Sequence, residues 1–368
     1  MAYTAELVTD PAVFAALAPA WARLHRRCSA ATPFQNHAWL HSWWLSYGRP
    51  GRLRLFLVRD ADGELAAAAA LTAVRRPLPA LVPLGGSVSD YGDVLLADEH
   101  ADGAAAALTG SLAEAARTAL IDLREVRPGA AAERIYDRWS GPRHRLSDSV
   151  CLELPALPMD ELVARLPSAK AQQRARAKLR KLRTLGVRRE IVRPDEVDGA
   201  LQRLLALHRL QWQGRRVTGE HLRPRFAEHL VRAAGPMVRS GDAVVTRFHL
   251  DDDVVAVDLT LTSPRLAGGY LYGAHPLLRE RKADVAVMLL DACAAHLPTS
   301  GPGTLSMLRG SEPYKLHWRP DPVVNQRLLL ARGSTAPLLG AALAQAGARR
   351  RAGQLLTRWR ERDGGGRS

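Results

Sequence analysis

The chain has 368 residues, a hydrophobic content of 47% and a formal net charge of +15 at pH 7. This length predicts two domains, because single hydrophobic cores stop growing beyond roughly 250–300 residues. The longest apolar run, Leu65–Val74, is about half of a membrane span, and the N-terminus lacks the basic segment of a signal peptide. The three scattered cysteines fit neither a disulfide framework nor a zinc site. We therefore expect a cytoplasmic protein with no metal and no transmembrane segment.

The positive charge is concentrated in two segments. Ten basic residues and one acid lie between Lys170 and Arg193, and six arginines and one acid lie between Arg349 and Arg362. The first segment is compatible with contact to tRNA phosphate or to anionic lipid. We favour a solvated or weakly contacting face, because no aromatic residues interleave the arginines to stack on bases.

The first 150 residues alternate helical and strand patterns. Helical spacing of apolar residues predicts helices over 11–27 and 32–48, and we expect the three tryptophans of the second helix to lie in the core. Two apolar segments flank an acidic turn and predict a β-hairpin over 52–74. A strand with a glycine loop, a helix and a strand follow over 81–98, 110–120 and 120–126.

The pattern then restarts. The predicted order is helix (168–186), helix (200–215), hairpin (243–262), strand (268–278), helix (284–297), strand (304–310), short helix (311–318) and strand (323–331). A basic C-terminal helix follows. The first of these helices has an apolar seam at Ala171, Ala175, Leu179 and Leu182. Phe56–Thr72 aligns without a gap over Thr246–Thr262, and both are hairpins with acidic turns that follow a tryptophan-bearing helix. The sequence therefore predicts two copies of one mixed α/β unit.

This order of elements resembles the GNAT acyltransferase fold. Four segments are similar to the CelD-like branch of that superfamily: "PFQNHAWLHSWW", "LRTLGV", "YLYGAHP" and "LRGSEPYKLHW". Members of this branch are similar to Fem-type aminoacyl transferases, which carry two GNAT units. The resemblance implies an α/β fold with mixed sheets and tandem GNAT-like units. The expected domains are a non-catalytic unit over 1–150, a donor-binding and catalytic unit over 151–333, and a basic helix with a disordered tail over 334–368.

The resemblance also implies acyl-CoA, acetyl-CoA or longer, as cosubstrate. GNAT enzymes hold the coenzyme A pyrophosphate at the N-terminus of the helix that corresponds to 284–297. The residues implied here are Arg279, Arg281, Lys282, Ala283 and Asp284, with Tyr272 as a wall of the cleft. The chain departs from the family because no glycine lies between Gly273 and Gly301. Basic side chains can compensate, since a helix N-terminus already favours anions.

The stretch "RGSEPYKLHW" concentrates reactive side chains behind a predicted strand. Acyl transfer to an amine requires a base for the ammonium and an acid for the leaving thiolate. By resemblance, Tyr314 is the candidate acid. Lys315 is a candidate contact for a phosphate or carboxylate, and Glu312 is a candidate base. The alternative is a capping loop in which the glycine, serine and proline only shape a turn.

Asp258 is a second candidate base. Alternation along 254–262 places it on the face opposite Val257 and Leu259, and a carboxylate within an apolar strand lies either in solvent or in a polar cleft. His275 is a third candidate, although a turn histidine before proline is the commoner case. Substrate contacts are expected from Trp212, Arg309 and Trp318, of which the first is as compatible with a core position.

The favoured function is an N-acyltransferase that moves an acyl group from acyl-CoA to a small-molecule amine or amino-sugar acceptor by direct attack. One alternative is a Fem-type transferase with an aminoacyl-tRNA donor. The other is a non-catalytic partner of a biosynthetic pathway.

Overall fold

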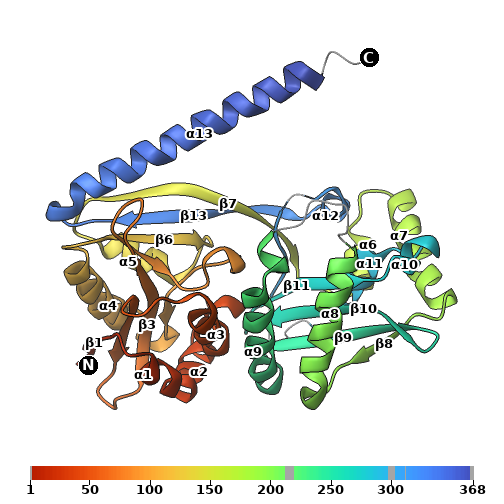
Figure 1. Cartoon of the computed structure of the whole chain (residues 1–368), viewed down its shortest axis with the longest axis horizontal. Coiled ribbons are helices and arrows are strands. Elements are labelled where there is room, and N and C mark those ends of the chain that lie inside the picture. Colours follow the sequence, from red (N-terminus) through yellow and green to blue (C-terminus); the bar gives the residue numbers. More distant parts are fainter. Residues whose placement is uncertain (1, 212–218, 297–302, 311, 365–368) are drawn as a thin grey trace.

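A single mixed sheet runs through both halves of the molecule (Figure 1). The computed structural model describes residues 2–211, 219–296, 303–310 and 312–364, with side chains described as far as residue 352. The strands are β1 Thr4–Val8, β2 Leu53–Arg59, β3 Leu65–Val74, β4 Ala80–Pro83, β5 Leu95–Leu96, β6 Leu120–Val126, β7 Arg143–Pro155, β8 Arg188–Ile191, β9 Ala243–Leu250, β10 Asp253–Thr262, β11 Leu266–Ala274, β12 Thr304–Arg309 and β13 Asp321–Leu330. The main α-helices are α1 Pro11–Ala16, α2 Ala18–Arg26, α3 His37–Tyr47, α4 Ala101–Ala115, α5 Ala131–Arg138, α6 Met159–Ala164, α7 Ala169–Thr184, α8 Val197–Gln211, α9 Pro224–Ser240, α10 Leu277–Glu280, α11 Val285–Ala294, α12 Pro313–Leu316 and α13 Ala336–Gly364.

The strand order shows the internal repeat. The path β1-β2-β3-β4-β6 in the first half corresponds to β8-β9-β10-β11-β12 in the second. In both paths the first three pairings are antiparallel and the last is parallel. The aligned hairpins of the sequence are β2–β3 and β9–β10. The predicted α/β fold with tandem GNAT-like units is confirmed.

The halves exchange their last strands. β7 follows the first half in the chain but pairs with β12 of the second, whereas β13 follows the second half and pairs with β6 of the first. β7 and β13 also pair with each other from Arg143 to Glu153, and they form the long arms that join the halves in Figure 1. The expected boundary between residues 150 and 151 thus falls inside β7.

Several elements differ from the sequence expectation for physical reasons. The helix predicted over 11–27 is two helices, α1 and α2, which meet at Leu17. The strands β1 and β8 are exposed and have little apolar alternation to reveal them. The helix α9 carries Pro236 in its interior, a residue that normally ends a helix. It packs against α3 and joins the two halves on one face of the sheet.

The two basic segments form helices. In α7 the predicted seam is buried or half-buried, with Ala175 and Leu182 in the core and the cations exposed. The helix α13 packs through Leu339 and Ala342 against the ends of β4, β6 and β13, and then projects away from the body (Figure 1). The tail over 365–368 lies outside the described residues.

Candidate active site

The parallel strands β11 and β12 define a cleft in the second half. Their ladder covers only Leu266–Gly268 and Thr304–Ser306, so beyond it the two strands are not paired with each other. A cavity of about 180 Å³ lies there. Its lining comes from β10, β11, β12, α11 and α12: Asp258, Gly269, Tyr272, Ala286, Leu289, Leu290, Cys293, Leu305, Ser306, Met307, Tyr314 and Lys315. We call this the donor cavity. It brings a carboxylate, two phenols and an ammonium to one apolar space.

Asp258 lines the donor cavity from β10. Its side chain is almost fully buried, and its Oδ2 atom accepts a hydrogen bond of 2.8 Å from the hydroxyl of Thr260. Burial raises the pKa of the Asp258 carboxyl to about 7, because the charged form loses its hydration, and the Thr260 bond lowers it only in part. A carboxyl with this pKa exchanges its proton near neutral pH, as a general base must.

Tyr314 lines the same cavity from α12, where it is 40% exposed. Burial of its phenol, with the nearby Tyr272 and Glu312, raises the pKa, so the hydroxyl stays protonated at neutral pH. The ammonium of Lys315 is buried; it donates 2.8 Å to the carbonyl of Arg309 and pairs with Glu312 at 2.9 Å. Glu312 caps α12, is half exposed and is absent from the cavity lining.

The predicted cosubstrate residues lie around the N-terminus of α11, which is part of the cavity wall. Asp284 is the N-cap, accepts 3.0 Å from the backbone N–H of Val287, and pairs with Lys178 of α7 at 2.7 Å. Lys282 has a φ of 57°, the left-handed conformation that a glycine adopts easily, so the loop turns here without one. Arg279, Arg281 and Lys282 are exposed, and within the described residues none of them has an acidic ion-pair partner, while Ala283 is buried beneath them.

The remaining predicted residues are divided between the cavity and other parts of the structure. His275 follows β11, where its Nδ1 atom accepts 3.1 Å from the backbone N–H of Leu277, and it does not line the cavity. Trp318 is buried in the apolar cluster under β12 and α11. Trp212 lies outside the described residues. Tyr272 lines the cavity, and its hydroxyl accepts 3.0 Å from Gln211.

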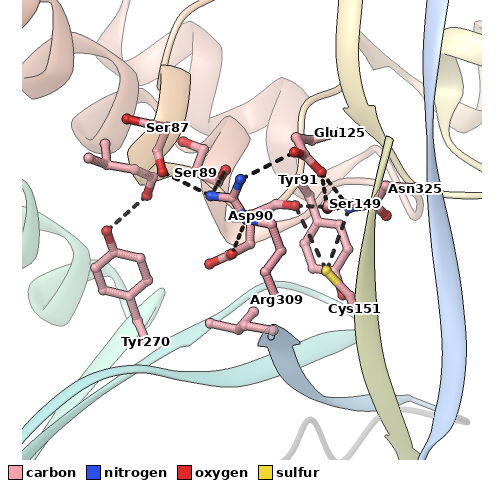
Figure 2. Close-up of polar contacts among 12 residues, drawn as sticks. Ser87, Ser89, Asp90, Tyr91, Glu125, Ser149, Cys151, Tyr270, Arg309 and Asn325 are labelled. Carbon is pink, nitrogen blue, oxygen red and sulfur yellow. Dashed lines mark hydrogen bonds and ion pairs between the residues drawn. The ribbon is translucent and has the colours of Figure 1, made fainter. Parts of the chain in front are cut away.

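Arg309 points out of the second half and into the first (Figure 2). Its guanidinium donates 2.6 Å to Asp90, 3.2 Å to Glu125, and 2.8 and 2.9 Å to the carbonyls of Ser87 and Ser89. It is therefore a clamp between the halves, and it lines a separate cavity of the first half.

A buried network that was not predicted from the sequence lies beside the donor cavity. The hydroxyl of Tyr91 lies 2.9 Å from Glu153 and 2.8 Å from the hydroxyl of Ser306, a cavity residue. Glu153 is held by two hydrogen bonds of 2.7 and 2.6 Å from Arg127. A signal was present, because Glu153 is a lone acid in the apolar segment "VCLEL", as Asp258 is in its strand. The first half thus contributes Tyr91 to the surroundings of the cavity.

No helix in the described part of the chain is long and apolar enough to cross a membrane. Among the same residues, no group of histidine, cysteine, aspartate and glutamate is arranged to hold a metal ion.

Comparison with known proteins agrees with this geometry. Residues 169–316 match the family model described as an acetyltransferase (GNAT) domain. No curated protein matches the chain. A protein of unknown function from Bacteroides thetaiotaomicron superposes with a TM-score of 0.59 at 12% identity, over 89% of this chain and 100% of that one.

Two further solved structures share the fold. FemX superposes with a TM-score of 0.57 at 11% identity, over 92% of this chain and 99% of that one. The C-terminal domain of a putative lysylphosphatidylglycerol synthetase from Agrobacterium fabrum superposes with a TM-score of 0.54 at 13% identity, over 91% of this chain and 97% of that one.

The repeat and the cleft define a protein of two GNAT-like units, the second of which carries the donor cavity. Residues 169–316 of this second unit match an acetyltransferase (GNAT) domain, and the chain as a whole shares its fold with FemX.

Proposed function

We propose that the protein is a cytoplasmic N-acyltransferase that moves an acyl group from acyl-CoA to a small-molecule amine or amino sugar. The observation that carries this proposal is that Asp258, a buried carboxyl with a pKa of about 7, and Tyr314, a protonated phenol, line one cavity. The pairing supplies a base and an acid to the same reacting centre.

The chemistry is a direct transfer. Asp258 takes a proton from the acceptor ammonium, and the free amine attacks the thioester carbonyl. The tetrahedral intermediate collapses with cleavage of the C–S bond, and Tyr314 gives its proton to the leaving sulfur. The attacking nitrogen loses its extra proton as the amide forms, and this proton restores the Tyr314 phenol. Burial raises the pKa of the Cys293 thiol to about 12, so this cavity cysteine stays protonated and is a poor nucleophile. This supports attack without a covalent enzyme intermediate.

The donor would be held from the N-terminus of α11. The unpaired cations Arg279, Arg281 and Lys282 stand where the helix dipole also favours the pyrophosphate. The apolar lining of α11 and β12 suits a pantetheine arm and an acyl group.

Titration with acetyl-CoA and longer acyl-CoAs tests this function. We expect saturable binding that is weakened about tenfold or more in R281Q/K282Q, since two charge-assisted contacts are removed. R180Q/R183Q, which removes the same charge from the exposed face of α7, is the matched control and should bind normally. Unchanged CoA binding in R281Q/K282Q would contradict the donor site.

A second candidate keeps the fold and replaces the donor with an aminoacyl-tRNA. It is favoured by α7, on which seven basic side chains are exposed and no acid is present: Lys170, Arg174, Arg176, Lys178, Arg180, Lys181 and Arg183. Binding of tRNA that falls steeply with salt, without CoA binding, would favour this candidate. Binding to anionic vesicles instead would indicate a peripheral membrane contact.

A further inference from the structure

The first half contains an arginine pocket at the end of its β2–β3 hairpin. It has a volume of about 610 Å³ and lies away from the donor cavity. Its lining consists of Trp43, Tyr47, Arg49, Arg52, Thr72, Ala73, Val74, Arg75 and Arg76. Four of these nine residues are arginines, and none is acidic.

Backbone geometry brings the arginines together from two segments. A turn closes where the N–H of Arg52 donates 3.1 Å to the carbonyl of Arg49, and Gly51 supplies the positive φ of 71° that this turn needs. The N–H of Ala73 then donates 2.8 Å to the carbonyl of Arg52, which sets the turn beside the end of β3. Arg75 and Arg76 follow directly.

These positive charges are not neutralised within the protein. In the described part of the chain, none of the four guanidinium groups makes an ion pair or a side-chain hydrogen bond. Burial, together with Glu220, raises the pKa of Tyr47, and this acid is already held by Arg225 at 2.7 and 2.8 Å. Like charges gathered in a concave site repel one another, so the pocket favours an anion from outside.

An aromatic wall completes the pocket. The rings of Trp43 and Tyr47 stack at 5.6 Å with an interplanar angle of 15°, and Arg225 lies over the Tyr47 ring at 4.8 Å. The pocket shares Val74 and Arg76 with the cavity of about 490 Å³ that Arg309 lines.

We propose that the arginine pocket binds the phosphate group of a small phosphorylated ligand, a phosphate or diphosphate ester. The planar guanidinium fork matches phosphate oxygens in pairs, and such bonds are stronger when both partners are charged. The concave shape and the aromatic wall fit a compact ligand better than a flat nucleic-acid or membrane surface. This site is independent of the proposed transfer reaction, because binding at it is measurable without any acyl donor.

Calorimetry with inorganic pyrophosphate and orthophosphate, on the full chain saturated with CoA, tests the site. We expect one pyrophosphate per chain, bound about tenfold or more weakly by R52Q/R75Q. R52K/R75K keeps the positive charge but loses the paired N–H donors of the guanidinium groups. It should bind pyrophosphate with an affinity between those of the parent protein and R52Q/R75Q. The control R174Q/R176Q removes equal charge from α7 and should leave pyrophosphate binding unchanged.

Three results would overturn the site. The first is that pyrophosphate shows no saturable binding. The second is that R174Q/R176Q loses as much affinity for pyrophosphate as R52Q/R75Q does. The third is that R52Q/R75Q weakens binding only to tRNA or to phosphatidylglycerol vesicles and not to pyrophosphate. The proposed donor site is tested separately. R281Q/K282Q should weaken CoA binding and leave pyrophosphate binding in the arginine pocket intact. The melting temperature of each variant checks that the arginines were replaced without unfolding the protein.

Discussion

The ammonium of Lys315 donates a hydrogen bond of 2.8 Å to the carbonyl of Arg309, whose guanidinium in turn holds Asp90 at 2.6 Å. Lys315 lines the donor cavity, and the side chain of Arg309 reaches into the first half. The loop that carries Tyr314 is therefore tied to the junction between the two units.

Replacing Lys315 with methionine should weaken this junction. The change leaves the Arg309 carbonyl without its buried donor, and we expect a loss of about 1–3 kcal/mol in the free energy of unfolding, measured with urea. The control is R117Q, which breaks an exposed pair with Glu114 and should change stability by less than about 0.5 kcal/mol. Equal effects in both variants would show that Lys315 is not a structural tie.

Asp258 should control the pH dependence of transfer. The reaction requires its carboxylate, so kcat/KM should fall as the pH drops below about 7, the pKa that burial gives this group. D258N should lower kcat by about 100-fold or more and remove this limb of the profile. An unchanged pH profile in D258N would mean that another residue is the base. E312Q, which replaces the other candidate carboxylate, is the matched comparison.

The same group should make stability depend on pH. A carboxyl whose pKa is raised on folding binds its proton more tightly in the folded chain, so its contribution to stability is full below about pH 4 and is lost as the pH rises to about 7. At pH 8 we therefore expect D258N to be more stable than the parent by about 1 kcal/mol or more. Below about pH 4 the two proteins should unfold at similar urea concentrations, because the carboxyl is then protonated in the folded and the unfolded chain. If the stability difference between D258N and the parent protein grew as the pH was lowered, the pKa of Asp258 would be lowered on folding and not raised.

Tyr91 should matter although it belongs to the first unit. Y91F removes the hydroxyl between Glu153 and Ser306, and we expect unfolding to become easier by about 1–2 kcal/mol because buried groups lose a partner. The control is Y136F, measured in the same way by chemical denaturation. Tyr136 is partly exposed, and its hydroxyl has no hydrogen bond to any described residue. Similar midpoints for Y91F and the parent protein would indicate that the network contributes no net stability.

The exchanged strands should make the two halves unfold together. Leu328 lies on β13 but is fully buried in the core of the first half, so L328A should cost about 2–5 kcal/mol. Hydrogen exchange should then accelerate in peptides from both α4 and α11. V324A, at an exposed position of the same strand, is the control. Acceleration confined to α4 would mean that the halves are separate folding units.

Periodicity predicted the hairpins, the seam of α7 and the duplication, because these depend on residues close in sequence. Asp258 stood out for the same reason, as a charge within an apolar strand. The network of Tyr91, Glu153 and Ser306 was not predictable, since its members come from three separate segments that only the sheet brings together.

The sequence by itself determined that this chain is two copies of one mixed α/β unit and that the stretch "RGSEPYKLHW" belongs to the second copy. Local pattern is sufficient for this, because burial of alternate side chains imposes the period of each element. Only the tertiary structure decided that β7 and β13 exchange halves, that Arg309 serves the junction, and that four arginines share one pocket. These outcomes depend on pairing and packing between distant segments, and no spacing along the chain encodes which distant strand will be the partner.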